Sequence, residues 1–229
     1  MKTIALLPMK AHSERVKGKN FRSLAGKPLF KWILDALLAC NEIDQVVINT
    51  DGRKILSENG LTESERVVIR DRREELVGDF TSMNLILEDD IRALEADRYI
   101  MTHTTNPLLQ SATISAALRD YTDAVYRGMG DSLFGVTKFQ SRFYHADGSA
   151  INHDPDNLIR TQDLEPWYEE NSCVYVFSAG SFAATSARIG KRPILFEIPK
   201  LQAIDIDEKE DWFLASAVAK GLHDRSNYA

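Results

Sequence analysis

Short apolar runs alternate along this chain with longer segments in which apolar residues recur every three or four positions. The short runs are rich in β-branched residues and predict strands at residues 3–7, 45–49, 67–70, 99–102, 132–137 and 173–177. The longer segments predict helices at residues 28–40, 51–59, 82–96, 114–125 and 207–220. Strands that alternate with helices are typical of a parallel sheet covered on both faces. We therefore expect an α/β protein with a three-layer, Rossmann-like architecture and a mainly parallel sheet.

Residues 139–170 interrupt this alternation. The segment is polar, rich in Asp, Asn and His, and offers few apolar anchors, among them Ile151, Leu158 and Ile159. We interpret it as an inserted arm or lid that leaves the main sheet of a single domain over residues 1–229. Exchange between the subunits of a dimer is one use for such an arm.

Composition and charge exclude several classes of protein. The chain has 229 residues, 44% of them hydrophobic, which is enough for one sizeable core. A net charge of -6 argues against a surface that coats DNA or RNA. The apolar start is too short for a signal peptide, and no apolar run reaches the roughly 18 residues of a membrane span. Cys40 and Cys173 match no metal-ligand spacing. We expect a cytoplasmic protein whose partners include neither a nucleic acid polymer nor a membrane.

A cluster of cations directly follows the first predicted strand. Five of them, opposed by one carboxylate, lie close together: Lys10, Arg15, Lys17, Lys19 and Arg22, against Glu14. Ligands of parallel sheets bind beyond the carboxyl ends of the strands, so this loop is placed to hold phosphates, with Ser13 as a further donor. The nearby glycines have neither the P-loop nor the dinucleotide spacing, which disfavours a dehydrogenase. A solvated basic loop is the alternative interpretation.

Two carboxylates near the other end of the chain suggest a metal. Asp205 and Asp207 would share one side of an extended chain, with Ile204 and Ile206 anchoring the other side. Two hard oxygen ligands suit Mg²⁺, particularly when substrate phosphates complete its shell. Asp207 also fits a helix N-cap, with Glu210 completing a capping box. A cap does not explain Asp205, which needs a partner if it is buried between two isoleucines.

Polar residues at other element boundaries have both structural and functional interpretations. Asp79 and Ser82 lie where the 82–96 helix begins and fit helix caps. His103 and Asn106 follow the 99–102 strand, where they could meet a ligand or satisfy the strand end. Asn171, just before the 173–177 strand, could read a sugar or hold a loop.

Taken in order, these segments resemble the acylneuraminate cytidylyltransferase family, the CMP-sialic acid synthetases, over most of the chain. Residues 6–22 resemble the signature loop of that family, with Ser13, Lys19, Asn20 and Arg22 at motif positions. Residues 204–207 resemble its metal-binding Ile-Asp-Ile-Asp motif, the most specific match. Further matches lie at residues 24–29, 50–52 and 105–108, and at Arg72, Glu75, Leu76, Asp79, Ser82 and Asn171.

The departures from the family pattern concentrate on the sugar side. His103 stands where the family has glutamine, and Glu169 stands where sialic acid enzymes often carry arginine, which reverses the charge. The usual arginine of the loop is Lys10, its usual glycine is Arg15, and the arginine after the 105–108 motif is Leu109. The nucleotide half of the site is therefore expected to be retained and the sugar half altered.

The resemblance implies a nucleotidyltransferase fold and attack by the anomeric hydroxyl of a 2-keto-3-deoxy sugar acid on the α-phosphate of CTP, releasing pyrophosphate. It implies Mg²⁺ as cofactor, CTP and a sugar acid as partners, and a homodimer. The residue roles that it implies are catalysis by Lys19, Asp207 and Arg15; nucleotide binding by Lys10, Ser13, Asn20, Arg72, Asp79 and Ser82; substrate binding by His103, Asn106, Glu169 and Asn171; and metal binding by Asp205 and Asp207. Two alternatives remain open: a nucleotidyltransferase with another sugar or sugar phosphate as acceptor, and a non-catalytic nucleotide-binding protein.

Overall fold

Seven strands form the main sheet of this protein, for which a computed structural model describes residues 1–11 and 18–226. The strands are β1 (Thr3–Leu6), β4 (Gln45–Thr50), β5 (Val67–Asp71), β6 (Arg98–Thr102), β7 (Ser132–Phe139), β8 (Trp167–Phe177) and β9 (Pro193–Glu197). Their order across the sheet is β5-β4-β1-β6-β8-β7-β9. β8 is antiparallel to both of its neighbours, and every other pairing is parallel. The prediction of a mainly parallel sheet is confirmed.

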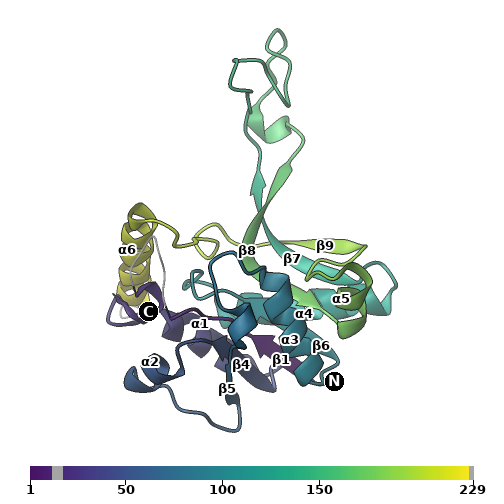
Figure 1. Ribbon diagram of the computed structural model, residues 1–229. Helices are drawn as coiled ribbons and strands as arrows, with labels where there is room; N and C mark the ends of the chain where they lie inside the picture. The colour runs from purple at the N-terminus through teal and green to yellow at the C-terminus, as the bar shows by residue number, and fades with distance from the viewer. Residues whose placement is uncertain (12–17, 227–229) are drawn as a thin grey trace.

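Helices cover both faces of this sheet (Figure 1). One face packs against α1 (Leu29–Leu38), α2 (Arg53–Glu58) and α4 (Ser111–Tyr126), and the other against α3 (Met83–Ala93) and α5 (Ala179–Thr185). The helices bury the alternating faces of strands such as β1, whose four residues are all buried. The three-layer prediction is therefore confirmed. No helix in the described residues is long and apolar enough to cross a bilayer.

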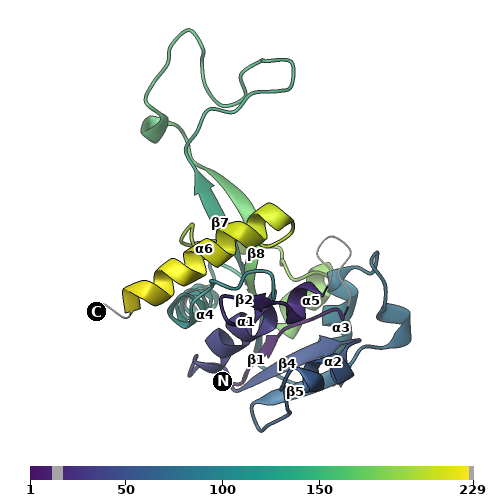
Figure 2. The same cartoon turned by 90° about the vertical axis from the view of Figure 1, so that its left-hand side faces the viewer.

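A third, smaller core ties the end of the chain to its beginning. The last helix, α6 (Lys209–Ser226), packs Trp212 and Ala215 against Leu24 and Leu29, next to the short hairpin of β2 (Ser23–Leu24) and β3 (Lys27–Pro28). Figure 2 shows α6 lying across the body of the molecule, with α1 and β2 beneath it. This packing brings the segment before α6 to the loop after β1.

The 139–170 segment leaves the body of the molecule as a long hairpin (Figures 1 and 2). The outer parts of β7 and β8 pair from Val136 with Glu170 to Phe139 with Trp167 and form its base. Beyond them the chain has one 3-10 turn, η3 (Thr161–Asp163), and an isolated bridge between Tyr144 and Ala150. Because this pairing extends β8 back to Trp167, the strand is longer than the predicted 173–177.

Other element predictions need correction. The sequence pattern predicted neither α5 nor β9, and it missed the β2-β3 hairpin. β9 lies at an edge of the sheet and alternates exposed and half-buried residues. Its apolar run, Ile194 to Phe196, is only three residues long and was not recognised as a strand. Asp51 does not cap α2, because its carboxylate accepts a hydrogen bond from the Ala11 amide at 2.7 Å. The last helix begins at Lys209 rather than at Asp207.

Candidate functional site

The two ends of the chain meet at Lys19. This residue begins a short 3-10 turn, η1 (Lys19–Phe21), and its side chain is almost fully buried. Its Nζ donates to the Ile206 carbonyl at 2.5 Å and lies 3.5 Å from Asp207 Oδ1. The basic loop and the acidic pair, far apart in sequence, therefore form one site.

The turn after β6 holds the acidic segment in place. The Ile206 amide donates to the Thr105 carbonyl at 2.8 Å, and the Asn106 side chain donates to the Ile204 carbonyl at 3.4 Å. Ile206 is fully buried, as the alternating pattern predicts. Asn106 is also fully buried. Its amide nitrogen supports the acidic segment from beneath, and the prediction that it binds the acceptor stays a prediction.

Asp205 has the environment of a cation ligand. Its Oδ1 is buried and has no hydrogen-bond partner within the described residues. Burial raises the pKa of this carboxyl, a hydrogen bond to Thr105 opposes the rise, and the charge of Asp207 adds to it. A bound cation would satisfy the orphan oxygen and favour the ionised form. The described residues contain no cluster of three or more His, Cys, Asp or Glu, so a metal here would need oxygens from a ligand, which fits Mg²⁺.

The cap of α6 is built from Asp211 rather than from Glu210. The amides of Asp207 and Glu208 donate to Asp211 Oδ2 at 3.0 and 2.8 Å. The predicted capping box is therefore wrong, because Asp211 and not Glu210 accepts the amide hydrogen bonds. Because Asp211 caps the helix, the carboxylate of Asp207 faces Lys19 instead.

The first residues of the basic loop are held by contacts that do not involve Lys19 or the acidic pair. Lys10 Nζ lies 3.1 Å from Asp79 Oδ1, in an ion pair that is partly exposed. Asn20 donates from Nδ2 to the Lys10 carbonyl at 2.8 Å and accepts from Thr104 Oγ1 at 2.7 Å. Asn20 thus clamps the loop to the end of β6, and Asp79 pairs with the loop rather than capping a helix. The predicted residues Ser13 and Arg15 lie outside the described part of the chain.

The loop also lies against the turn after β4. A Cβ on Gly52 would be 2.9 Å from the Cβ of Ala11, closer than side chains pack. Thr50 accepts the Gly52 amide at 2.9 Å and shapes this turn. Glycine is required here by the close approach of the loop.

Arg72 supports the same loop from below. It is buried and donates to the Asn49 side chain at 3.0 Å, to the Asn49 carbonyl at 2.9 Å and to the Met9 carbonyl at 3.3 Å. Asn49 in turn donates to Asp90 at 2.8 Å, and burial raises the pKa of Asp90 to about 6. Burial lowers the pKa of Arg72. Ser82 caps α3, as predicted, by accepting the Asn84 amide at 3.3 Å.

His103 lies between the acidic pair and the arginine of another loop. It is half-buried at the end of β6. Burial, and then the positive charges of Arg188 and Lys19, lower the pKa of His103 to about 4, while Asp207 acts in the opposite direction. The ring is therefore neutral near pH 7 and can donate one hydrogen bond and accept another.

Asn171 holds a bulge in β8. The register against β7 shifts between Phe134 and Val136, and Ser172 has a φ of 57°. Asn171 donates to Thr137 Oγ1 at 3.2 Å and accepts the Cys173 amide at 3.3 Å. Of the two interpretations left open, the structure supports the one in which Asn171 holds a loop.

The bulge presents Glu170, not Glu169, to the site. Glu169 pairs with Thr137 at the exposed base of the arm. The neighbouring Glu170 accepts a hydrogen bond from the Tyr175 hydroxyl and lies 3.6 Å from Arg188. Neighbouring residues of a strand point to opposite faces, so Glu170, and not the predicted Glu169, contacts Tyr175 and Arg188. Arg188 lies in a loop without a motif, so no signal in the sequence marked it.

The comparisons with known proteins decide the family. The family model described as cytidylyltransferase matches residues 4–211. The chain belongs to the cytidylyltransferase family. Pseudaminic acid cytidylyltransferase of Campylobacter jejuni is 23% identical over 235 residues, which cover 98% of this chain and 99% of that protein. N-acylneuraminate cytidylyltransferase of Streptococcus agalactiae is 26% identical, over 93% of this chain and 52% of that protein. The resemblance to the sialic-acid type of CMP-sugar synthetase is confirmed.

A solved structure supports the fold of this cytidylyltransferase. It is CMP:2-keto-3-deoxy-manno-octonic acid synthetase complexed with CTP, with a TM-score of 0.65. The match covers 96% of this chain and 99% of that one at 13% identity. At that identity the likeness shows the shared fold, which confirms the predicted nucleotidyltransferase architecture.

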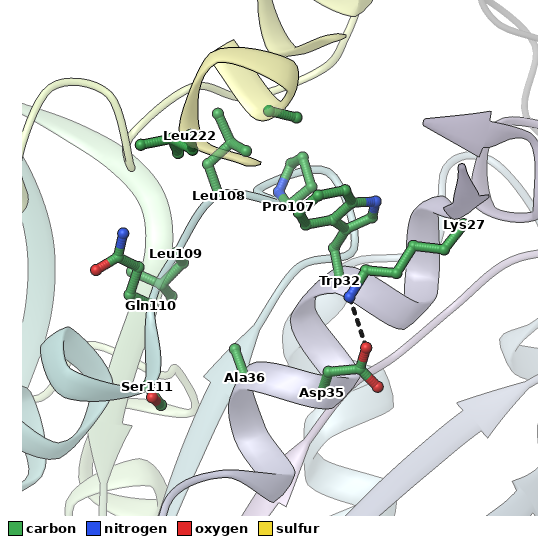
Figure 3. A pocket seen from close by; sticks show the side chains of 11 residues that line it. Lys27, Trp32, Asp35, Ala36, Pro107, Leu108, Leu109, Gln110, Ser111 and Leu222 are labelled. Atoms are coloured by element: carbon green, nitrogen blue, oxygen red, sulfur yellow. Dashed lines mark hydrogen bonds and ion pairs between the residues drawn. The ribbon is translucent and has the colours of Figure 1, made fainter. Parts of the chain in front are cut away.

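A separate pocket of about 480 Å³ lies outside this site (Figure 3). It is bounded by α1, by the segment from Pro107 to Ser111 and by α6. Lys27 lies over the Trp32 ring and pairs with Asp35 at 2.6 Å on one side of it. The other lining residues are mostly apolar, so the pocket lacks the carboxylate and cation set of the site described above.

Proposed function

We propose that this cytidylyltransferase transfers CMP from CTP to the anomeric hydroxyl of a sialic-acid-like 2-keto-3-deoxy sugar acid and releases pyrophosphate. The observation that carries the proposal is the convergence of Lys19 with Asp205 and Asp207. Cations and a carboxylate pair at one sheet edge are the groups that a triphosphate and its counter-ion need.

The roles of the nucleotide-side residues follow from their positions. Lys19 is fixed by the Ile206 carbonyl and would hold the triphosphate, together with Lys10, Ser13 and Arg15 of the same loop. Asn20 and Arg72 keep the loop in place from the protein side. Asp79 orients Lys10, and Ser82 sits at the start of α3.

Asp205 and Asp207 are proposed to hold Mg²⁺. The unpartnered oxygen of Asp205 supports this assignment. When bound, the ion would neutralise charge on the triphosphate. Alignment of the acceptor hydroxyl with the α-phosphate is left to the protein, with neutral His103 placed to contact the acceptor beside Lys19 and Asp207.

We further propose that the enzyme is a cytoplasmic homodimer in which the arm contacts the partner. The arm exposes Tyr144, Leu158 and Ile159 by 54%, 60% and 45%. Exposed apolar side chains on a projecting hairpin fit a contact with a second copy. Sedimentation of the wild type against a Leu158→Asp, Ile159→Asp double variant tests this proposal, with a shift from dimer to monomer expected and two unchanged dimers contradicting it.

A substrate panel tests the reaction. Pyrophosphate release is measured with CTP, UTP, GTP or ATP, with Mg²⁺ or EDTA, and with pseudaminic, N-acetylneuraminic and 3-deoxy-manno-octulosonic acids. We expect release only with CTP, Mg²⁺ and at least one acid. Release with a neutral sugar or a sugar phosphate instead would indicate another acceptor class. Stabilisation by CTP and Mg²⁺ in thermal unfolding, without product from any acid, would indicate a binding protein that does not catalyse.

A further inference from the structure

Three residues on the β8 side of the site form a cluster that no motif explains. The guanidinium carbon of Arg188 lies 4.2 Å from the centre of the Tyr175 ring, and NH2 donates to the Tyr175 hydroxyl at 3.2 Å. Glu170 accepts from the same hydroxyl and lies 3.6 Å from Arg188. Tyr175 is fully buried, so its ring is a rigid platform for the guanidinium.

Arg188 keeps donors for a ligand. Its side chain is 21% exposed, which leaves it within reach of a bound molecule. Within the described residues its Nε is buried and has no hydrogen-bond partner. Arginine has five N–H donors, and a buried donor without an acceptor destabilises the protein. An arginine held in this state fits a residue whose acceptor is a bound anion.

The order of the strands places this arginine opposite the phosphate loop. The basic loop follows β1, His103 follows β6, and Tyr175 lies on β8, and these strands are neighbours in that order. Tyr175 pairs with Met101, two residues before His103. The Arg188 amide donates to the Asn84 side chain at 3.4 Å, in the first turn of α3. Arg188 therefore lies on the far side of His103 from the loop.

We propose that Arg188 binds the carboxylate of the sugar acid and selects an acid over a neutral acceptor; the proposal rests on the proposed function. In such an acid the carboxylate is attached to the anomeric carbon, so it must lie beside the reacting phosphate. Lys19, which contacts Ile206 and Asp207, is assigned to the triphosphate. Arg188 offers a second cation, and its charge and that of Lys19 both act on His103.

Kinetics of variants with two forms of the acceptor test this assignment. We compare the wild type with Arg188→Met and Arg188→Lys. The control is Arg192→Met, which replaces an exposed arginine at the other end of the sheet. The acceptor is the acid that works best in the panel, used as the free acid and as its methyl ester. Pyrophosphate release gives kcat and KM for each acceptor and for CTP, and thermal unfolding reports folding.

We expect Arg188→Met to raise KM for the free acid about 10- to 100-fold, as the loss of a charge-assisted pair does. KM for CTP should stay unchanged, and the preference in kcat/KM for the free acid over the ester should disappear. Arg188→Lys, which keeps the charge, should recover part of the preference, and Arg192→Met should behave as the wild type.

Two results overturn the assignment while leaving the proposed function intact. One is an undiminished preference for the free acid in both Arg188 variants, and the other is a rise confined to KM for CTP, which would make the triphosphate the bound anion. A wild type that releases no pyrophosphate with any acid overturns the proposed function, and the role of Arg188 with it.

Discussion

The two halves of the site are built differently. On the nucleotide side, direct hydrogen bonds and ion pairs join segments far apart in sequence: Lys19 to Ile206 and Asp207, and Asn20 to Thr104. On the acceptor side, a bulge in β8 and a loop without regular structure bring Glu170, Tyr175 and Arg188 together around His103. Lys19, Asn20, Asp205 and Asp207 on the nucleotide side lie at motif positions of the family, whereas His103 on the acceptor side departs from the family pattern.

This difference shows which part of the site can vary. The nucleotide side is tied into the sheet and the third core, because Ile206 packs against Leu24 and Trp212. A change at Ile206 would disturb both the packing of this core and the position of the carboxylates. The acceptor side uses a bulge and a loop, whose residues can be replaced without rebuilding the sheet. Substitutions on the two sides should therefore have effects of different kinds.

The largest effect is expected on the nucleotide side. Lys19→Ala and Asp207→Ala should each lower pyrophosphate release by about 10²- to 10³-fold. The first removes a cation that would stabilise the transferring phosphate, and the second removes a carboxylate that would hold the metal ion. Circular dichroism should show an unchanged fold. Glu208→Ala, an exposed neighbour of Asp207, is the matched control and should retain activity. Normal turnover by either variant would remove that residue from the mechanism.

The next effect is a pH dependence of stability on the acceptor side. The pKa of His103 is about 4 in the folded protein and about 6.5 when unfolded, so the unfolded state binds the proton more tightly. The free energy of unfolding should therefore fall on acidification. We expect His103 to account for about 2 kcal/mol of this fall between pH 7 and pH 5, and urea unfolding at the two pH values measures it.

His103→Gln, which carries the residue of the family, should remove this part of the pH dependence. His145→Gln on the exposed arm should leave it in place. Equal slopes of stability against pH for the wild type and His103→Gln would show that His103 titrates normally in the folded protein.

The smallest effect distinguishes two adjacent carboxylates. Glu170→Gln should change kcat/KM for the acceptor by about 3- to 10-fold, because it weakens the hydrogen bond and ion pair that position Arg188. Glu169→Gln, at the base of the arm, should leave this value within about twofold of the wild type, as exposed substitutions usually do. A larger change in kcat/KM for Glu169→Gln than for Glu170→Gln would show that Glu169 is the carboxylate that acts on the acceptor side.

The sequence predicted the sheet and the meeting of the basic loop with the acidic pair, because both rest on local patterns. Buried strands such as β1 and β4 are apolar runs, and the motif residues lie at strand ends that a parallel sheet brings together. Asp205 was marked by its position between two isoleucines. These signals are contained in short segments, so a single sequence can show them.

The acceptor side escaped prediction because it depends on long-range packing. Arg188 acquires its role only when Tyr175 of β8 lies beneath it, and nothing near residue 188 indicates that contact. The bulge at Ser172 reverses which of Glu169 and Glu170 faces the site. Asn106 lies beneath the acidic segment through a contact with Ile204 that no local pattern contains.

We propose that the basic loop and the carboxylate pair together bind the triphosphate of one nucleotide and its metal ion. Diffraction from crystals grown with Mn²⁺ and a non-hydrolysable CTP analogue tests it most directly, because the anomalous signal locates the metal. We expect one peak in contact with the carboxylates of Asp205 and Asp207 and with phosphate oxygens, and the Lys19 ammonium beside the same phosphates. A triphosphate bound away from Lys19, or a metal that contacts neither aspartate, would contradict it.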